Sequence, residues 1–272
     1  DFTSWRFIIL FALILLAPAS ATYGAFENIR GAVTDSTQFV FLKLFTTSGG
    51  ALPSFLTFIV FFVPIVGIAL GFDAINSERN SGTLSRLLSQ PIYRDAVING
   101  KFLAGVVTIA VMLTSIVLLV AGVGLRMTGV PPSSEEAIRL LAFLLVSIVY
   151  GAFWLGLAIL FSVFLRRVAT SALASIAVWI FFIFFMLMLA GVIANILVPV
   201  DQTSSSQELL RHGEGSLGAM RLSPITLFEE AVIVLLVPGV RTLGLVTQSA
   251  ARWMITNPLS LGQSLLLVWP HL

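Results

Sequence analysis

The chain contains two long apolar runs separated by one polar connection. The first run is LFTTSGGALPSFLTFIVFFVPIVGIALGF, from Leu44 to Phe72, and the second is FLAGVVTIAVMLTSIVLLVAGVGL, from Phe102 to Leu125. Neither contains Asp, Glu, Lys or Arg. Both reach the roughly 20 residues that a helix needs to cross about 30 Å of hydrocarbon. Because backbone groups in lipid must find hydrogen-bond partners inside the protein, these runs predict membrane-spanning helices.

Similar runs recur along the whole chain, so we predict an all-α integral membrane protein with six transmembrane helices. The expected spans are 5–26, 52–73, 102–125, 140–165, 168–199 and 257–272. They form a single transmembrane domain over residues 1–272. The chain begins at Asp1 rather than Met and ends inside an apolar run. We therefore expect the native protein to continue at both ends, with the sixth span truncated here.

The composition excludes several other classes of protein. Hydrophobic residues make up 58% of the 272 residues and charged residues 10%, against about 45–50% and about 25% in soluble domains. With 22 Phe and no Cys, the chain is not disordered, collagen-like or a disulfide scaffold. A net charge of +2 gives no argument for nucleic acid as a partner.

The distribution of basic residues predicts the orientation. The connection at 74–101 and the turn after the fourth span are rich in cations, whereas the opposite side holds most of the acids. Since short cytoplasmic loops carry the excess of Lys and Arg, we place the N-terminus and the 74–101 connection in the cytoplasm of a plasma (inner) membrane. The cations concerned are Arg79, Arg86, Arg94, Lys101, Arg166 and Arg167.

The outer connection at 200–256 is the longest. Its part from Gln202 to Gly218 is polar and rich in Ser and Gly, which predicts a loop. Ser223-Pro224 is a helix start, and this helix must end at Pro238-Gly239, too short to span a bilayer. A second short helix is expected at 241–254. Short extracytoplasmic helices thus precede the last span.

The 74–101 connection contains a short two-sided helix. Ser81 can cap it, Leu84, Leu87 and Leu88 fall on one face, and Pro91 stops it. Such a helix could dock into a groove on a cytosolic partner and pass force to the two adjoining spans. It could equally lie on anionic lipid with its arginines at the headgroups. The residues alone leave both interpretations open.

The pattern Glu78-Arg79-x-x-Gly82-Thr83-Leu84-x-x-Leu87-Leu88-Ser89-x-Pro91-x-x-Arg94, followed by Gly100-Lys101, resembles the signature of ABC-2 type permeases. These are the membrane subunits of ATP-binding-cassette exporters. The resemblance implies that Gly82–Ser89 is the coupling helix that contacts an ATPase subunit. It further implies a working unit of two ATPase chains and two permeases, the second permease being another copy or a homologue. The coupling residues that it implies are Glu78, Gly82, Thr83, Leu84, Arg86, Leu87, Leu88, Ser89, Pro91 and Arg94.

The chain carries no phosphate-binding loop of its own. Gly100-Lys101 is followed by Phe102 rather than Ser or Thr. We therefore expect a non-catalytic subunit that binds no cofactor, with ATP and Mg²⁺ held by the partner ATPase. His212 and His271 are too few for a histidine metal site. Adjacent Glu229 and Glu230 would point about 100° apart on a helix, which argues against a catalytic pair.

Small and aromatic residues in two spans suggest contact surfaces. Gly67 and Gly71 in the second span, with Ser171 and Ser175 in the fifth, permit close helix contact, either inside one subunit or between two permeases. The resemblance places both spans beside the transport path. Part of the aromatic run in the fifth span could then meet a hydrophobic cargo, although it could equally face lipid. The candidate path residues are Trp179, Phe182 and Met186.

Two alternative functions remain from the sequence. A membrane scaffold without a transport cycle would use the 200–256 loop to hold extracytoplasmic or accessory proteins. An ion-coupled carrier is less consistent with the sequence, because the apolar runs contain no Asp, Glu, Lys or Arg, whereas such carriers keep carboxylates at membrane depth.

Overall fold

The computed structural model describes residues 39–46, 54–83, 89, 93–129, 131–200, 205–237 and 260–271. Within these ranges every regular element is a helix. The chain divides into two compact units, Asp1–Ala177 and Val178–Leu272, which are described separately.

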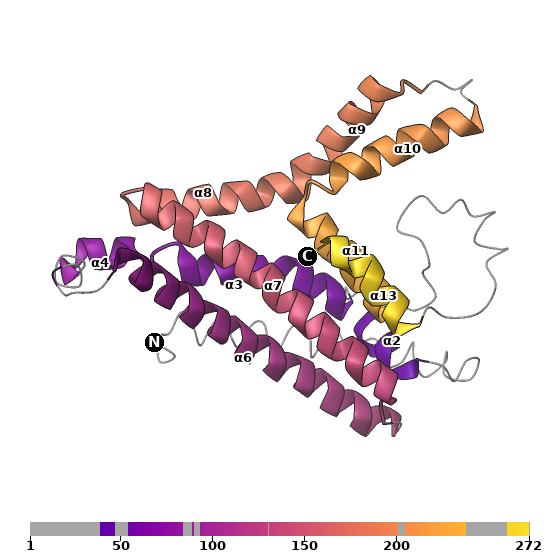
Figure 1. The fold of residues 1–272 in the computed structure, drawn as a ribbon, viewed down its shortest axis with the longest axis horizontal. Coiled ribbons are helices and arrows are strands. Elements are labelled where there is room, and N and C mark those ends of the chain that lie inside the picture. The colour runs from indigo at the N-terminus through magenta and orange to yellow at the C-terminus, as the bar shows by residue number, and fades with distance from the viewer. Residues whose placement is uncertain are drawn as a thin grey trace. The chain divides into compact units, whose positions relative to one another are not determined.

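The first unit is built around three long helices that lie side by side (Figure 1). A short helix adjoins them at each end, and a sixth helix begins in this unit and finishes in the second. In chain order, the elements are α2 (Val40–Thr46), α3 (Phe55–Gly71), α4 (Asn76–Asn80), α6 (Arg94–Thr128), α7 (Ser134–Phe164) and α8 (Val168–Ile180).

Helices α6 and α7 begin before the apolar runs on which their prediction rested. Ser133 and Glu136 form a reciprocal capping box, so α7 begins at Ser134, six residues before the expected span at 140. Gly129 ends α6 in the left-handed conformation, with φ of 68°. The polar first turns therefore belong to the helices although they contribute nothing to the apolar length.

Helices α3 and α7 pack with almost no space between their backbones. A Cβ atom added to Gly67 would lie 2.9 Å from the Gly151 carbonyl oxygen, and one added to Gly71 would lie 2.7 Å from the Ala158 Cβ. Pro64 lies inside α3 and has no N–H, so the Val60 carbonyl loses its helical donor. The Tyr150 hydroxyl of α7 donates to that carbonyl oxygen at 3.1 Å.

Helix α2 is almost wholly buried, which the sequence did not reveal. Phe45 is 0% exposed and its ring meets that of Phe55 edge-on, with centroids 5.1 Å apart. The Phe41 N–H donates to Glu136 Oε1 at 3.0 Å. A side chain of α7 therefore supplies the acceptor for the first turn of α2.

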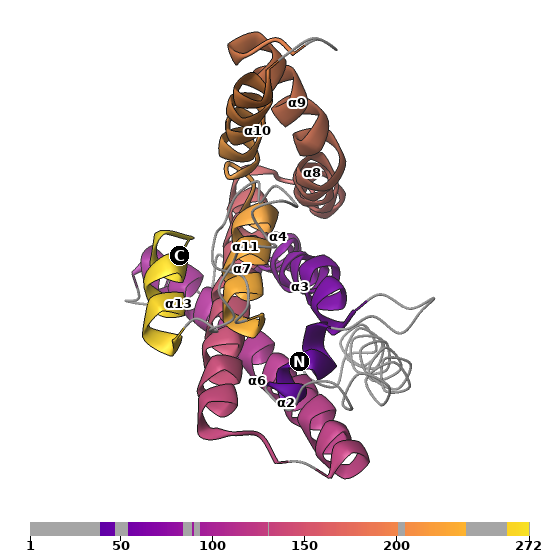
Figure 2. The same ribbon diagram turned by 90° about the vertical axis from the view of Figure 1, so that its right-hand side faces the viewer.

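The second unit contains two helical pairs. The last turn of α8 leads into a π-helical turn and then α9, and α10 folds back against α9 (Figure 2). Helix α11 packs against α13. The elements are η1 (Phe181–Phe185), α9 (Met186–Leu197), α10 (Ser206–Met220), α11 (Pro224–Leu236), α13 (Leu261–Val268) and η2 (Trp269–His271).

The prediction of a loop over 202–218 is wrong from Ser206 onward. A capping box between Ser205 and Glu208 starts α10, and Ala190 and Ala194, both 0% exposed, provide a flat face of α9. The start of α11 at Pro224 agrees with the sequence. The second short helix, expected at 241–254, lies outside the described residues.

Among the described residues, four helices are long and apolar enough to cross a membrane. They are Phe55–Asn80, Asp95–Arg126, Ser134–Phe164 and Val168–Leu197, and they coincide with the second to fifth expected spans. The first expected span, 5–26, lies outside the described residues. The sixth, 257–272, is described only from 260 to 271, as α13 and η2.

The close contact at Gly71 can be tested through the stability of the folded protein. Gly71→Ala should lower the unfolding temperature in detergent, because the added methyl group forces α3 and α7 apart at a cost of about 1–3 kcal/mol. The matched control is Gly122→Ala in α6, where nothing lies within 4 Å of the added atom. That variant should be neutral or stabilising, since alanine is the better helix former. Equal effects of the two variants would contradict the packing described.

Candidate coupling site

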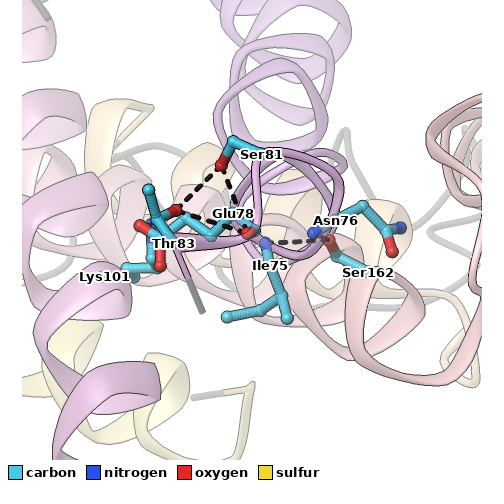
Figure 3. Close-up of polar contacts among 7 residues, drawn as sticks. All are labelled: Ile75, Asn76, Glu78, Ser81, Thr83, Lys101 and Ser162. Atoms are coloured by element: carbon cyan, nitrogen blue, oxygen red, sulfur yellow. Dashed lines mark hydrogen bonds and ion pairs between the residues drawn. The ribbon is translucent and has the colours of Figure 1, made fainter. Parts of the chain in front are cut away.

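A network of polar contacts lies where α3, α4, α6 and α7 meet (Figure 3). We call it the junction and define it as residues 72–83 together with Lys101 and Ser162. It begins where α3 ends at Gly71, because the chain makes turns over 72–75 before α4 starts. The Ala74 N–H bonds to the Gly71 carbonyl, so helical pairing is interrupted at this point.

Ser162 of α7 accepts the two N–H groups that follow the interruption. Its hydroxyl oxygen lies 3.1 Å from the Ile75 nitrogen and 3.2 Å from the Asn76 nitrogen. Ser162 and Asn76 are both 0% exposed. A hydroxyl oxygen has two lone pairs, so one side chain can satisfy both donors. Ser162 thereby caps α4 from a different helix.

An ion pair joins the junction to α6. Lys101 Nζ lies 2.6 Å from Glu78 Oε1, and both side chains are roughly a quarter exposed. Glu78 is on α4, before the expected coupling helix, and Lys101 is on α6, after it. The pair therefore connects the two ends of that segment.

Hydrogen bonds from two hydroxyl groups stabilise the turn that follows α4. Ser81 Oγ donates to the Glu78 carbonyl at 3.2 Å and lies 2.8 Å from Thr83 Oγ1, which itself donates to the same carbonyl at 3.3 Å. Gly82 between them has a φ of 71°, a backbone conformation that residues other than glycine rarely adopt. The turn at 81–83 thus directs the chain away from α4.

The remaining predicted coupling residues are placed only in part. Ser89 is exposed, and Arg94 is the first residue of α6. The others lie outside the described residues, so the coupling helix at Gly82–Ser89 stays a prediction. Those outside are Leu84, Arg86, Leu87, Leu88 and Pro91.

The small residues singled out in the sequence are buried. Gly67 and Gly71 face α7 of the same chain. Ser171 and Ser175 of α8 are both 0% exposed, and Ser175 Oγ donates to the Ser171 carbonyl at 2.9 Å.

The candidate path residues of the second unit flank a π-helical turn. Trp179 precedes the Phe181–Phe185 turn, Phe182 lies within it and Met186 follows it. Trp179 and Phe182 are partly exposed, and Met186 is 4% exposed. The Trp179 Nε1 atom is buried with no hydrogen-bond partner among the described residues. Turns of this kind are frequent at functional sites of helical proteins.

The second unit also contains a charge cluster that the sequence did not predict. Glu230 Oε2 lies 3.0 Å from Arg221 Nε and 3.0 Å from His271 Nε2. The cluster joins α11 to η2 across 41 residues of sequence. Its neighbour Glu229 has a pKa above the ordinary value of 4.5, because burial disfavours the ionised carboxylate. The two carboxyl groups thus lie in different environments.

The described residues contain no group of three His, Asp or Glu side chains that could hold a metal ion. The polar contacts at the junction instead connect helices to one another. The fold and the site define the class of helical membrane proteins, here with a polar junction where α3, α4, α6 and α7 meet.

Residues 2–237 match the sequence model of the family described as "ABC-2 family transporter protein", and the chain belongs to that family. Membership of a transporter family agrees with the four helices that are long and apolar enough to cross a membrane. A curated relative from Pseudomonas aeruginosa, "Probable ABC transporter permease protein NosY", is 28% identical over 142 residues. The match covers 51% of this chain and 50% of that protein. The chain thus spans about half the length of the relative.

The Glu78–Lys101 pair predicts a charge-swap result. Lys101→Glu should lower stability in detergent, because it places two carboxylates together. The double variant Glu78→Lys, Lys101→Glu should recover most of the loss, with a coupling energy of about 0.5–1 kcal/mol, as expected for a partly exposed pair. Unfolding temperatures of the four variants of this cycle measure it. Additive effects would mean that the two side chains do not interact.

The environments of Glu229 and Glu208 predict opposite dependences on pH. Below about pH 4.5 Glu229 is protonated in both folded and unfolded chains, whereas above its raised pKa the buried carboxylate destabilises the fold. Glu229→Gln should therefore raise the unfolding temperature at about pH 8 and change it little at about pH 4.

Glu208 is the matched control. The Ser205 backbone N–H, and then its hydroxyl, hold the pKa of Glu208 below 4.5. Its contribution to stability is present above the unfolded pKa and is lost as the pH falls through the folded pKa. Glu208→Gln should therefore be neutral or destabilising at about pH 8. The same sign for both variants would contradict the assignment.

Proposed function

We propose that this chain is the permease subunit of an ATP-driven exporter, in which a separate ATPase binds the 74–101 connection. One observation carries the proposal. An ion pair between Glu78 on α4 and Lys101 on α6 connects the two helices that flank the expected coupling helix. A push on the segment between them would reach both spans together.

The orientation follows from charge. The 74–101 connection contains Arg79, Arg86, Arg94 and Lys101, which favours the cytoplasmic side of a plasma membrane, with the N-terminus also inside. That is the side on which ATP is available. The end of the first unit that carries α2 would then be the outer one.

The ATPase would hold ATP and Mg²⁺, and this chain would bind no cofactor. Closure of the ATPase pair on ATP would displace the Gly82–Ser89 segment, whose Leu84, Leu87 and Leu88 supply the apolar docking face. Family membership supports a second permease, as another copy or a homologue. The cargo would pass between the two permeases as the path changes from inward-open to outward-open.

The fifth span contains a candidate contact surface for the cargo. The π-helical turn at Phe181–Phe185 breaks the regular pairing of that helix and lies among Trp179, Phe182 and Met186. An irregular turn lined with aromatic rings and a thioether is suited to contact an apolar molecule.

The docking face can be tested with charge substitutions. Leu84→Asp and Leu87→Asp should abolish co-purification of the ATPase, because each places a carboxylate in an apolar contact. Ser85→Asp adds the same charge to another face of the expected helix and should leave the complex intact. Size-exclusion profiles of the isolated permease variants serve as the folding control.

The result also separates the alternatives. If the ATPase still assembles with both leucine variants and its activity is unchanged, the docking role is wrong. If the wild-type chain brings down extracytoplasmic partners and no ATPase, it is a scaffold. Transport that collapses with an ion gradient while ATP is present would mean an ion-coupled carrier.

A further inference from the structure

Helix α7 supplies side-chain partners to three backbone interruptions in the other elements of the first unit. Glu136 accepts the Phe41 N–H at the start of α2. Tyr150 donates to the Val60 carbonyl that Pro64 leaves without a donor in α3. Ser162 accepts the Ile75 and Asn76 N–H groups at the start of α4. Each partner comes from the same helix, although the three interruptions span 35 residues of another part of the chain.

Two of these contacts sit at opposite ends of α7. Glu136 is in its first turn and Ser162 in its last, about 39 Å apart at 1.5 Å per residue. The intervening backbone is a continuous helix, which changes length very little under load. A displacement of α4 would therefore be transmitted along α7 to α2, provided that the Ser162 contact holds.

Helices α3 and α4 are joined less rigidly than two parts of one continuous helix would be. The turns at 72–75 break the main-chain pairing, so α3 by itself does not fix the direction of α4. The hydrogen bonds from Ile75 and Asn76 to Ser162 do so instead, and all three residues are buried. Buried N–H groups without an acceptor are strongly disfavoured, so this contact resists separation.

We propose that Ser162 is a positioning residue that couples the segment leading into the docking site to α7, and through α7 to α2 at the opposite end of the first unit. The inference rests on the proposed function, because it takes the ATPase as the source of the displacement. It assigns the transmission of force to a hydroxyl on the fourth span, which is not part of the docking segment.

The experiment compares three variants by hydrogen–deuterium exchange. Ser162→Ala removes the acceptor, and Ser162→Cys keeps nearly the same size with a weaker acceptor. The control is Ser147→Ala on the same helix. Ser147 is 1% exposed, and its hydroxyl donates within α7, to the Phe143 carbonyl at 2.8 Å.

The first measurement uses the permease alone and follows the amides of residues 75 and 76. Ser162→Ala should speed their exchange about tenfold or more, which corresponds to the loss of about 1.4 kcal/mol of protection. The exchange rate of these amides in Ser162→Cys should lie between those of Ser162→Ala and wild type, and the rate in Ser147→Ala should equal that of wild type. Unchanged exchange in Ser162→Ala would overturn the proposal.

The second measurement uses the complex with its ATPase, without nucleotide and then trapped with Mg-ATP and vanadate. Exchange in α2 should change on trapping in wild type and in Ser147→Ala, and the change should be lost in Ser162→Ala although the ATPase remains bound. An α2 response that survives in Ser162→Ala would overturn the transmission. Since Ser162→Cys keeps the side-chain volume, it decides the same question if Ser162→Ala does not fold.

Failure of the proposed function gives a different pattern. No ATPase would then bind wild type, and α2 would show no nucleotide response in any variant. That result overturns the transmission together with the proposed function. The exchange of residues 75 and 76 would still report whether Ser162 caps α4.

Discussion

A backbone N–H or carbonyl group without a partner is too costly to leave in a low-dielectric interior, and this constraint shapes the first unit. At three places among the described residues where a backbone group lacks its helical partner, a side chain of α7 supplies one. Tyr150 donates to the carbonyl that Pro64 leaves without a donor in α3. Glu136 accepts an N–H at the start of α2, and Ser162 accepts two at the start of α4. Irregular backbone is thereby accommodated beside apolar helices, and α7 becomes the element that the others share.

Close packing and polar contacts act on the same helix pair. Gly67 and Gly71 bring α3 against α7 with no room for a side chain, so the hydrogen bonds at either end operate between elements that already fit together. The Glu78–Lys101 pair adds α6 to this assembly at the junction. Close packing and interhelical hydrogen bonds are two of the forces that hold helices together in a membrane, and this unit uses both on one helix pair.

The sequence predicted the spans more completely than the contacts between them. Apolar length alone located four helices that the structure describes, because hydropathy reports directly on transfer into lipid. Helix α2 was missed, since its residues continue an apolar run and only burial distinguishes it. Helix α10 was mistaken for a loop because its Ser and Gly content outweighed the capping box of Ser205 and Glu208. The sequence did not indicate the contacts of Ser162, whose partners lie 86 and 87 residues away. It singled out Glu78 and Lys101 but not the ion pair between them. The glycines of α3 were foreseen as a contact surface, but their partner helix was not.

The proposed function requires that an ATPase binds the segment between α4 and α6. A cryo-electron microscopy map of the chain in lipid nanodiscs, purified together with its ATPase and trapped with nucleotide, tests it most directly. The account predicts ATPase density in contact with residues 82–94. A map in which that segment lies among lipid headgroups or in solvent, with no ATPase against it, would contradict the account.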